Sequence, residues 1–446
     1  MTSGRTAILA SALACSTFAL CYGLAAALSQ TGVFEYVDVL FDTDVAWFLQ
    51  GFSEGRGTGT GWGARSLVHP NVANLVNPLV RAVAAACDSV NACSDPTRAR
   101  HALALVVSPA AAAVETLLVF LAARAIVDPG RALLIAILNL ALLPTLMYGA
   151  LPESFALSGG GFAALFYLVC RAASGRPVHQ GWWLLLGAAL ASVTVTNIWL
   201  FALGYAVTHA QGRWITLPAL LSAARVSVAA LGVTAVLALA LGSAYDALPQ
   251  YRTALQQLRE VRAPREHLAE RRWGSAVSGT IGLAVSGGFL NFPKALGDTI
   301  LPPRPFIQGS ALGLDSSRGT IGARADPSLQ FNFRETSADV GTLFALLTLA
   351  GAAGLAATSH GPQRLVYRVA LVLIAGNWMF HSLFGVELFL YAKHWSVAVA
   401  FLLAAWLNVR RTSAHIGTAV LLLVTVAAIW RDLRVFSDLF RALSVS

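Results

Sequence analysis

Four carboxylates, Glu35, Asp38, Asp42 and Asp44, lie within ten residues directly after the first apolar segment. Large apolar side chains such as Trp47 stand among and beside them. An acidic surface in water needs no such neighbours, so the mixture indicates carboxylates at a membrane surface, where partial burial adjusts a pKa for general-base chemistry. Asp42 and Asp44 are spaced so that both can approach one hydroxyl group or one divalent cation. The alternative is that they are acids near a helix start without a chemical role.

Basic residues at two other places can bind an anion. Arg65 and His69 are four residues apart, immediately before Pro70, and can face a common anion. Near the C-terminus, Lys393 and His394 offer a point charge and a hydrogen-bond donor to a phosphate. Only two of the 31 basic residues are lysines, which favours a specific role for Lys393. The alternative for this pair is a helix anchor at the membrane interface.

The composition indicates the environment in which these residues act. Of the 446 residues, 57% are hydrophobic and 12% are charged, whereas about 25% of the residues in a soluble globular protein are charged. Such a chain cannot cover its apolar surface with polar groups in water, which predicts an all-α polytopic membrane protein surrounded by membrane lipids. The net charge of +9 is therefore not interpreted as a sign of nucleic-acid binding.

Apolar runs of membrane-spanning length predict eleven transmembrane helices. The run 181–210 is too long for one upright span and holds Asn197 in its middle, so we expect two short helices folded as a hairpin with Asn197 at the tip. One tilted helix is the alternative. The segment 275–292 contains four glycines and is expected to be re-entrant or interfacial. The other runs lie near 6–29, 101–123, 132–149, 154–170, 222–243, 340–358, 366–384, 395–408 and 414–430.

Basic residues predict the orientation, because short cytoplasmic loops carry the excess of Lys and Arg. With a cytoplasmic N-terminus, every short inner loop contains a basic pair such as Arg171 and Arg176. The C-terminus and two long segments, 30–100 and 244–338, are then extracytoplasmic. Cys87 and Cys93 fall in the first of these segments, where an oxidising environment favours a disulfide that closes a small ring. Two free thiols are the alternative.

This order of elements resembles the GT-C superfamily of membrane glycosyltransferases. Its members have a first span, a long outer loop with an acidic D-x-D-like motif, a short helical hairpin and a second long outer loop. Asp42-Thr43-Asp44 followed by Arg65-x-x-x-His69-Pro70 resembles bacterial members that use polyprenyl-phosphate sugars. Asn71 stands where those members are expected to have leucine after the proline. Shorter similar segments are Leu151-Pro152-Glu153-Ser154, Thr196-Asn197 and Glu387-Leu388-Phe389-Leu390-Tyr391-Ala392-Lys393-His394.

The resemblance implies a GT-C-like module over residues 1–243, an extracytoplasmic loop at 244–338 and C-terminal transmembrane helices at 339–446. It implies a multi-pass enzyme of the bacterial inner membrane that moves a sugar from a polyprenyl-phosphate donor to a lipid or glycan acceptor at the extracytoplasmic face. Asp44 is the expected base, and Asp42 is a second catalytic residue or its partner in holding a cation such as Mg²⁺ or Mn²⁺. Both metal-dependent and metal-independent members exist. The expected substrate-binding residues are Arg65, His69, Glu153, Asn197, Tyr391, Lys393 and His394.

Two other functions fit a multi-pass chain. A secondary transporter or lipid flippase places charged groups and broken helices at mid-membrane. Glu115 is the charged residue deep inside a predicted core span, where ionisable groups are usually functional. Without a basic partner it can instead stay protonated and serve helix packing. A non-catalytic assembly protein is the third function. The concentration of polar chemistry in the outer loops favours transfer over transport. An assembly protein would not require four acids beside the first span, and it stays open as an alternative.

Overall fold

The computed structural model describes residues 3–35, 69–72, 96–210, 213–244, 288–303, 305–308, 330–332, 340–384, 391–408 and 414–445, and the single positions 45, 49, 82, 85 and 86. This part is helical apart from one short antiparallel pair of strands, β1 (Phe306–Gln308) and β2 (Gln330–Asn332). The helices are α1 (Ser3–Gln30), α5 (Pro96–Arg124), α6 (Pro129–Leu140), α7 (Leu143–Ala150), α8 (Phe155–Ala173), α9 (Gln180–Val193), α10 (Asn197–His209), α11 (Leu217–Ala244), α15 (Gly288–Ile300), α16 (Val340–Thr358), α17 (Pro362–Phe384), α18 (Lys393–Leu403) and α19 (Ala414–Val445), with 3-10 turns η1 (Val33–Glu35) and η4 (Ala404–Asn408).

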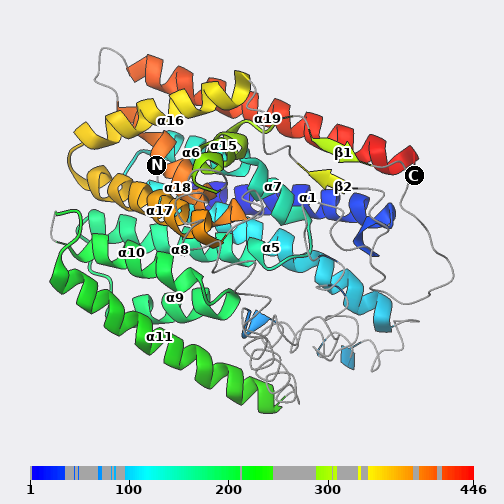
Figure 1. The fold of residues 1–446 in the computed structure, drawn as a ribbon, viewed down its shortest axis with the longest axis horizontal. Helices are drawn as coiled ribbons and strands as arrows, with labels where there is room; N and C mark the ends of the chain where they lie inside the picture. Colours follow the sequence, from blue (N-terminus) through cyan, green and yellow to red (C-terminus); the bar gives the residue numbers. More distant parts are fainter. Residues whose placement is uncertain are drawn as a thin grey trace, which may run out of the picture.

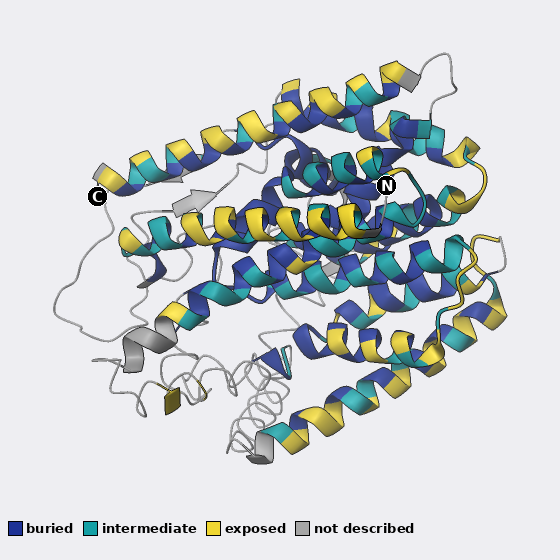
Figure 2. Ribbon diagram, turned by 180° about the vertical axis from the view of Figure 1, so that it is seen from behind, coloured by how far each residue is buried: buried dark blue, intermediate teal, exposed yellow. Residues whose placement is uncertain are grey.

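Several of these helices have the length and composition of membrane spans. Six of the described helices qualify, or seven if α6 and α7 are counted as one bent span. The chain is therefore a multi-pass, all-α membrane protein, but the described part does not reach the eleven spans expected from the sequence. The outward faces of these helices carry exposed apolar side chains. The exposed residues form the yellow stripes on the outermost helices in Figure 2. Such faces suit contact with lipid rather than with water.

The run near 132–149 is not the straight span that its hydropathy predicts. It divides into α6 and α7, whose axes differ by 61°. Pro144 lies in the first turn of α7 and has no backbone N–H to continue the helix from α6. Residues 143–150 are all buried, so this broken segment runs inside the bundle, where neighbouring helices can satisfy its freed backbone groups.

The run 181–210 forms two helices, as expected. α9 ends at Val193 and α10 begins at Asn197, and the two helices pack against each other. The intervening residues continue a run of β-branched side chains from Val193 to Thr196, which restricts helical rotamers. Thr194 has an extended backbone conformation, so the helix stops here. The prediction of a hairpin with Asn197 at its tip is confirmed.

α8 lies at the centre of the bundle beside α5 (Figure 1), and it also contacts α9, α10, α17 and α18. Its sequence Ser158-Gly159-Gly160-Gly161 lets these neighbours approach closely, as small residues do between membrane helices. Gly159 faces the side chains of Glu115 and Lys393, and Gly161 faces Leu190. The glycines therefore make room for the site described below.

The two termini lie at opposite ends of the bundle (Figure 1). The end that holds the connections after α5, α8, α10 and α16 is rich in arginine, and we call it the arginine end. Gln363 donates to the carbonyl of Ile126 across it, and the Arg368 guanidinium lies 5.2 Å from the Trp214 ring. The described arginines in these connections and the helix turns beside them are Arg124, Arg131, Arg171, Arg176, Arg213, Arg364 and Arg368.

Candidate functional site

A short segment of the first long loop, residues 69–72, docks on the tip of the α9–α10 hairpin. The backbone N–H of Asn71 donates to the carbonyl of Ser192 at 3.1 Å. The Asn71 side-chain amide donates to the hydroxyl of Ser192 at 3.0 Å and to the carbonyl of Thr234 in α11 at 3.1 Å. Asn71 is fully buried. The asparagine that departs from the expected leucine thus has a structural role, because it fastens the loop to two helices.

His69 contacts both the α7–α8 connection and the tip of the α9–α10 hairpin, which are far apart in the sequence. Its Nδ1 lies 2.7 Å from the carbonyl oxygen of Val193 and 3.1 Å from the hydroxyl of Thr194, both at the hairpin tip. The same nitrogen lies 3.5 Å from the hydroxyl of Ser154 at the start of α8. Because the carbonyl can only accept, Nδ1 of His69 is the donor in the shortest contact. The ring is thereby fixed at the end of the bundle opposite the arginine end.

Glu153 stands beside this histidine at the beginning of α8. Its Oε1 accepts hydrogen bonds from the backbone N–H of Ser154 at 2.9 Å and from the Ser154 hydroxyl at 3.1 Å. Its backbone N–H donates to the hydroxyl of Ser108 on α5 at 3.2 Å. The carboxylate is buried. Its position fits both interpretations of this residue, an acid that stabilises the start of a helix and a member of an acidic site.

Tyr391 and His394 approach the same end of α8 from the start of α18. The His394 ring lies 5.8 Å from the ring of Phe155 and 5.9 Å from that of Phe162, and His394 is 4% exposed. Tyr391 lies 6.1 Å from Phe155 in an edge-to-face arrangement. Since Phe155 directly follows Ser154, the structure brings four predicted substrate-binding residues, His69, Glu153, Tyr391 and His394, around one helix end.

His381, on α17, belongs to this group although the sequence analysis missed it. Its Nε2 lies 3.5 Å from Nδ1 of His394, and its ring stacks on Tyr391 at a centroid distance of 4.4 Å. His381 is buried. An isolated histidine near the end of an apolar helix was the available signal. We call His69, Glu153, Tyr391, His381 and His394 the histidine cluster.

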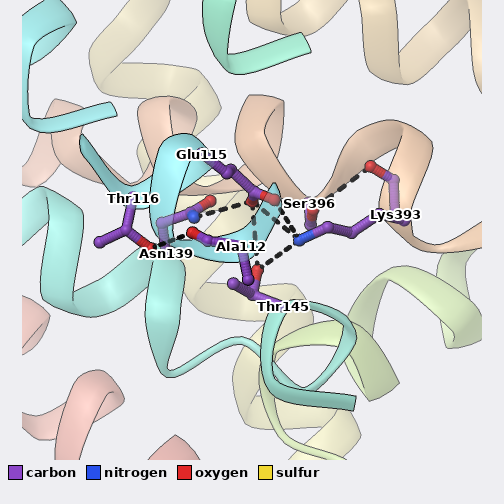
Figure 3. Close-up of polar contacts among 7 residues, drawn as sticks. All are labelled: Ala112, Glu115, Thr116, Asn139, Thr145, Lys393 and Ser396. Carbon is purple, nitrogen blue, oxygen red and sulfur yellow. Dashed lines mark hydrogen bonds and ion pairs between the residues drawn. The ribbon is translucent and has the colours of Figure 1, made fainter. Parts of the chain in front are cut away.

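Lys393 turns away from the histidine cluster and enters the core. Its Nζ lies 2.8 Å from Oε1 and 2.6 Å from Oε2 of Glu115, and it donates to the hydroxyl of Thr145 at 2.9 Å (Figure 3). Asn139 donates to Oε1 of Glu115 at 2.9 Å. The interpretation of Glu115 as an acid without a basic partner is therefore wrong. The amine expected to meet a lipid phosphate instead neutralises a carboxylate, and we call Glu115, Asn139, Thr145 and Lys393 the buried ion-pair cluster.

Asn197 is placed at the hairpin tip but uses its amide inside the protein. The side-chain nitrogen donates to the hydroxyl of Ser158 on α8 at 3.0 Å and to the carbonyl of Leu190 at 3.3 Å. Asn197 is fully buried. These contacts tie the second helix of the hairpin to α8, so what the structure describes for Asn197 is a positioning role beneath the histidine cluster.

The remaining predicted site residues lie outside the described residues. They are the two aspartates expected to act as base and metal ligand, the arginine paired with His69, and the two cysteines expected to form a disulfide: Asp42, Asp44, Arg65, Cys87 and Cys93. Their roles stay predictions. Within the described ranges, no group of three or more His, Cys, Asp or Glu residues has an arrangement that could hold a metal ion.

The histidine cluster combines three imidazoles, a phenol and a carboxylate at one end of the central helix. His69 contacts Ser154, and His394 packs on Phe155, the next residue, which begins α8. Imidazole nitrogens and a phenol can donate to and accept from hydroxyl groups, and imidazoles can also bind an anionic oxygen when protonated. The arrangement is therefore suited to a polar substrate with hydroxyl or phosphate groups. Comparison with known proteins finds no family model that matches this chain and no similar curated protein.

Proposed function

We propose that this protein is a membrane glycosyltransferase with a GT-C-like architecture. It moves a sugar from a polyprenyl-phosphate donor to a lipid or glycan acceptor at the extracytoplasmic face of a bacterial inner membrane. Asp44 removes the proton of the acceptor hydroxyl, and Asp42 assists it directly or by holding a divalent cation such as Mg²⁺ or Mn²⁺. The histidine cluster binds the sugar and the phosphate that leaves with the lipid.

One observation carries this proposal. His69 contacts Ser154 and Thr194, so the loop that bears the D-x-D-like motif reaches the same bundle end as the α7–α8 connection and the hairpin tip. The motifs that prompted the resemblance are separated by up to several hundred residues. Four of their described members, His69, Glu153, Tyr391 and His394, nevertheless lie around the start of α8, which supports a shared substrate site, while Lys393 and Asn197 bond inside the protein.

The distribution of charge supports the orientation. The four connections at the arginine end and the helix turns beside them hold seven described arginines against one described acid, Asp128, which pairs with Arg131 at 3.3 Å. Short basic loops favour the cytoplasmic side of a membrane. The histidine cluster lies at the opposite end and then faces the extracytoplasmic side, where a polyprenyl-phosphate sugar presents its headgroup.

The test is a transfer assay with the purified protein in detergent or liposomes. A panel of polyprenyl-phosphate sugars is offered together with a bacterial lipid and glycan extract as the source of acceptor, with and without Mg²⁺ or Mn²⁺, and release of the lipid phosphate is measured. Turnover should appear with at least one donor and fall about a hundredfold or more in Asp44→Asn, since general-base catalysis contributes roughly 10²–10⁴-fold. Asp42→Asn should also reduce it. Unchanged turnover in both variants would refute the mechanism, and no turnover with any donor would refute the function.

A second candidate is a secondary transporter or lipid flippase, and the buried ion-pair cluster favours it. An ion pair inside the bundle beside the broken α6–α7 segment is a feature of membrane transport proteins. Proteoliposomes distinguish the two functions. A transporter moves a labelled polyprenyl-phosphate sugar across the bilayer without cleaving it, and that movement fails when Lys393→Met removes the charge, whereas a transferase releases lipid phosphate without net movement.

A further inference from the structure

A pocket of about 250 Å³ opens at the arginine end, far from the histidine cluster in the fold. Arg176 and Pro177, from the α8–α9 connection, form one wall, and Trp183 of α9 with His209 of α10 forms the other. Arg176 and His209 can both carry positive charge, and none of the described residues that line the pocket is acidic. We call it the Arg176 pocket.

The wall that carries Arg176 is a well-defined turn. Gly175 has a φ of +76°, a left-handed conformation that a residue with a Cβ adopts only at a cost. Its N–H donates to the carbonyl of Ala172 at 3.0 Å, and the N–H of Arg176 donates to the carbonyl of Arg171 at 3.0 Å. Pro177 then restricts the next φ. The backbone below Arg176 is thus held in place before any ligand arrives.

The opposite wall holds His209 by its ring. The imidazole stacks on Tyr205 at a centroid distance of 3.9 Å and meets the edge of Trp183 at 5.4 Å. Nδ1 of His209 lies 2.9 Å from the carbonyl oxygen of Tyr205, so Nδ1 carries the hydrogen in that contact. Nε2 is the ring nitrogen left for a ligand. Nε2 accepts from a headgroup hydroxyl when the ring is neutral and donates to an anionic oxygen when the ring is protonated. Arg176 therefore offers the pocket a permanent positive charge, and His209 offers it a second polar contact.

Neighbouring side chains place the pocket at the depth of lipid headgroups. Trp182, next to the buried Trp183, is 62% exposed, and Trp214 in the α10–α11 connection is 48% exposed. Exposed tryptophans concentrate at membrane–water interfaces. Leu185, one turn further along α9, is also exposed and apolar. An amphipathic ligand can therefore place its headgroup in the pocket and its chains along the face of α9.

We propose that the Arg176 pocket binds the phosphate of an anionic glycerophospholipid. Basic pockets between membrane helices on the cytoplasmic side recognise such headgroups. The Arg176 guanidinium pairs with the phosphate, His209 contacts a phosphate or headgroup oxygen, and Trp183 forms the apolar floor. This site is separate from the proposed transfer reaction, and it holds whether or not the protein is a glycosyltransferase.

Native mass spectrometry of the full chain in a nonionic detergent tests this site. Phosphatidylglycerol and phosphatidylcholine are added separately at equal concentrations. One phosphatidylglycerol should be retained per chain, and Arg176→Gln should weaken its retention about tenfold, which corresponds to ~1.4 kcal/mol, because the variant loses the charge that pairs with the phosphate. Arg225→Gln is the matched control, since Arg225 is an exposed arginine of α11 that does not line the pocket. It should bind as the original protein does.

Three results would overturn the proposal. Equal retention of both lipids would mean that the chains alone are recognised. An equal loss in the two arginine variants would mean that only total charge matters. Displacement of the lipid by glycerol phosphate or inorganic phosphate at the same concentration would mean that the ligand is a soluble phosphate. Arg176 is exposed, so its variant should keep the thermal midpoint of the lipid-free protein, which the same preparations can verify.

Discussion

Lys393 and Glu115 form an ion pair between two side chains that are both 0% exposed, although 278 positions separate them in the sequence. The pair fastens the first turn of α18 to the middle of α5. His394 is the next residue after Lys393, and its ring faces Phe155 and Phe162 of α8. The ion pair therefore positions the α18 residue of the histidine cluster by fixing the backbone beside it.

Removing one charge of this pair should destabilise the protein strongly. Breaking a buried ion pair costs roughly 3–5 kcal/mol, because the remaining charge has no partner. Lys393→Met and Glu115→Gln should each lower the midpoint of thermal unfolding in detergent. The double variant should recover most of the loss, since the introduced amide can still accept from Asn139. If the double variant is as unstable as the sum of the single ones, the pair does not act as a unit.

Gly159 should not tolerate a side chain, because a Cβ at this position would overlap the Lys393 side chain and the Glu115 carboxylate. Overpacking of this kind costs about 1–3 kcal/mol, so Gly159→Ala should lower the unfolding midpoint. Gly232→Ala in α11 is the matched control, as nothing lies within 4 Å of a Cβ there. It should be neutral or slightly stabilising. Equal effects of the two substitutions would contradict the packing described around Gly159.

Asn71→Ala should release the loop segment from the hairpin tip. The substitution leaves the buried hydroxyl of Ser192 and the carbonyl of Thr234 without this donor, a loss of about 1–3 kcal/mol. Amide hydrogen exchange around residues 190–198 should become faster, while exchange in α16 should not change. A comparison with Thr358→Ala, an exposed position on α16, controls for general destabilisation. Unchanged exchange at the tip would show that Asn71 does not fasten the loop.

Under the proposed function, the two buried histidines should be needed for turnover rather than for stability. His381→Phe and His394→Phe keep an aromatic ring among Tyr391, Phe155 and Phe162 but remove the ring nitrogens. Each should reduce sugar transfer about a hundredfold with a nearly unchanged unfolding midpoint, because each removes ring nitrogens that contact the sugar or the leaving phosphate. His415→Phe, at an exposed position of α19, should leave transfer intact. Full activity of both cluster variants would exclude a role for the imidazoles in transfer.

Much of the fold could be predicted because membrane helices follow from local composition. The span expected at 340–358 coincides with α16. The break between α9 and α10 follows from a run of β-branched residues in an apolar stretch that is too long for one span. Pro144, at which the segment bends, is also present in the sequence, yet hydropathy alone predicts one straight span. Whether a membrane helix stays straight or bends at a proline depends on the helices packed around it, and a hydropathy profile holds no information about that packing.

The sequence by itself determined that this chain belongs in a membrane and where along the chain its apolar helices lie, since both depend on residues close together along the chain. The tertiary structure decided which polar groups meet. In the folded chain Lys393 pairs with Glu115, and His381 lies beside His394. Asn71 and Asn197 form hydrogen bonds that join separate segments. Such partners come from different helices, and their contacts depend on how those helices pack and rotate, which no local pattern specifies.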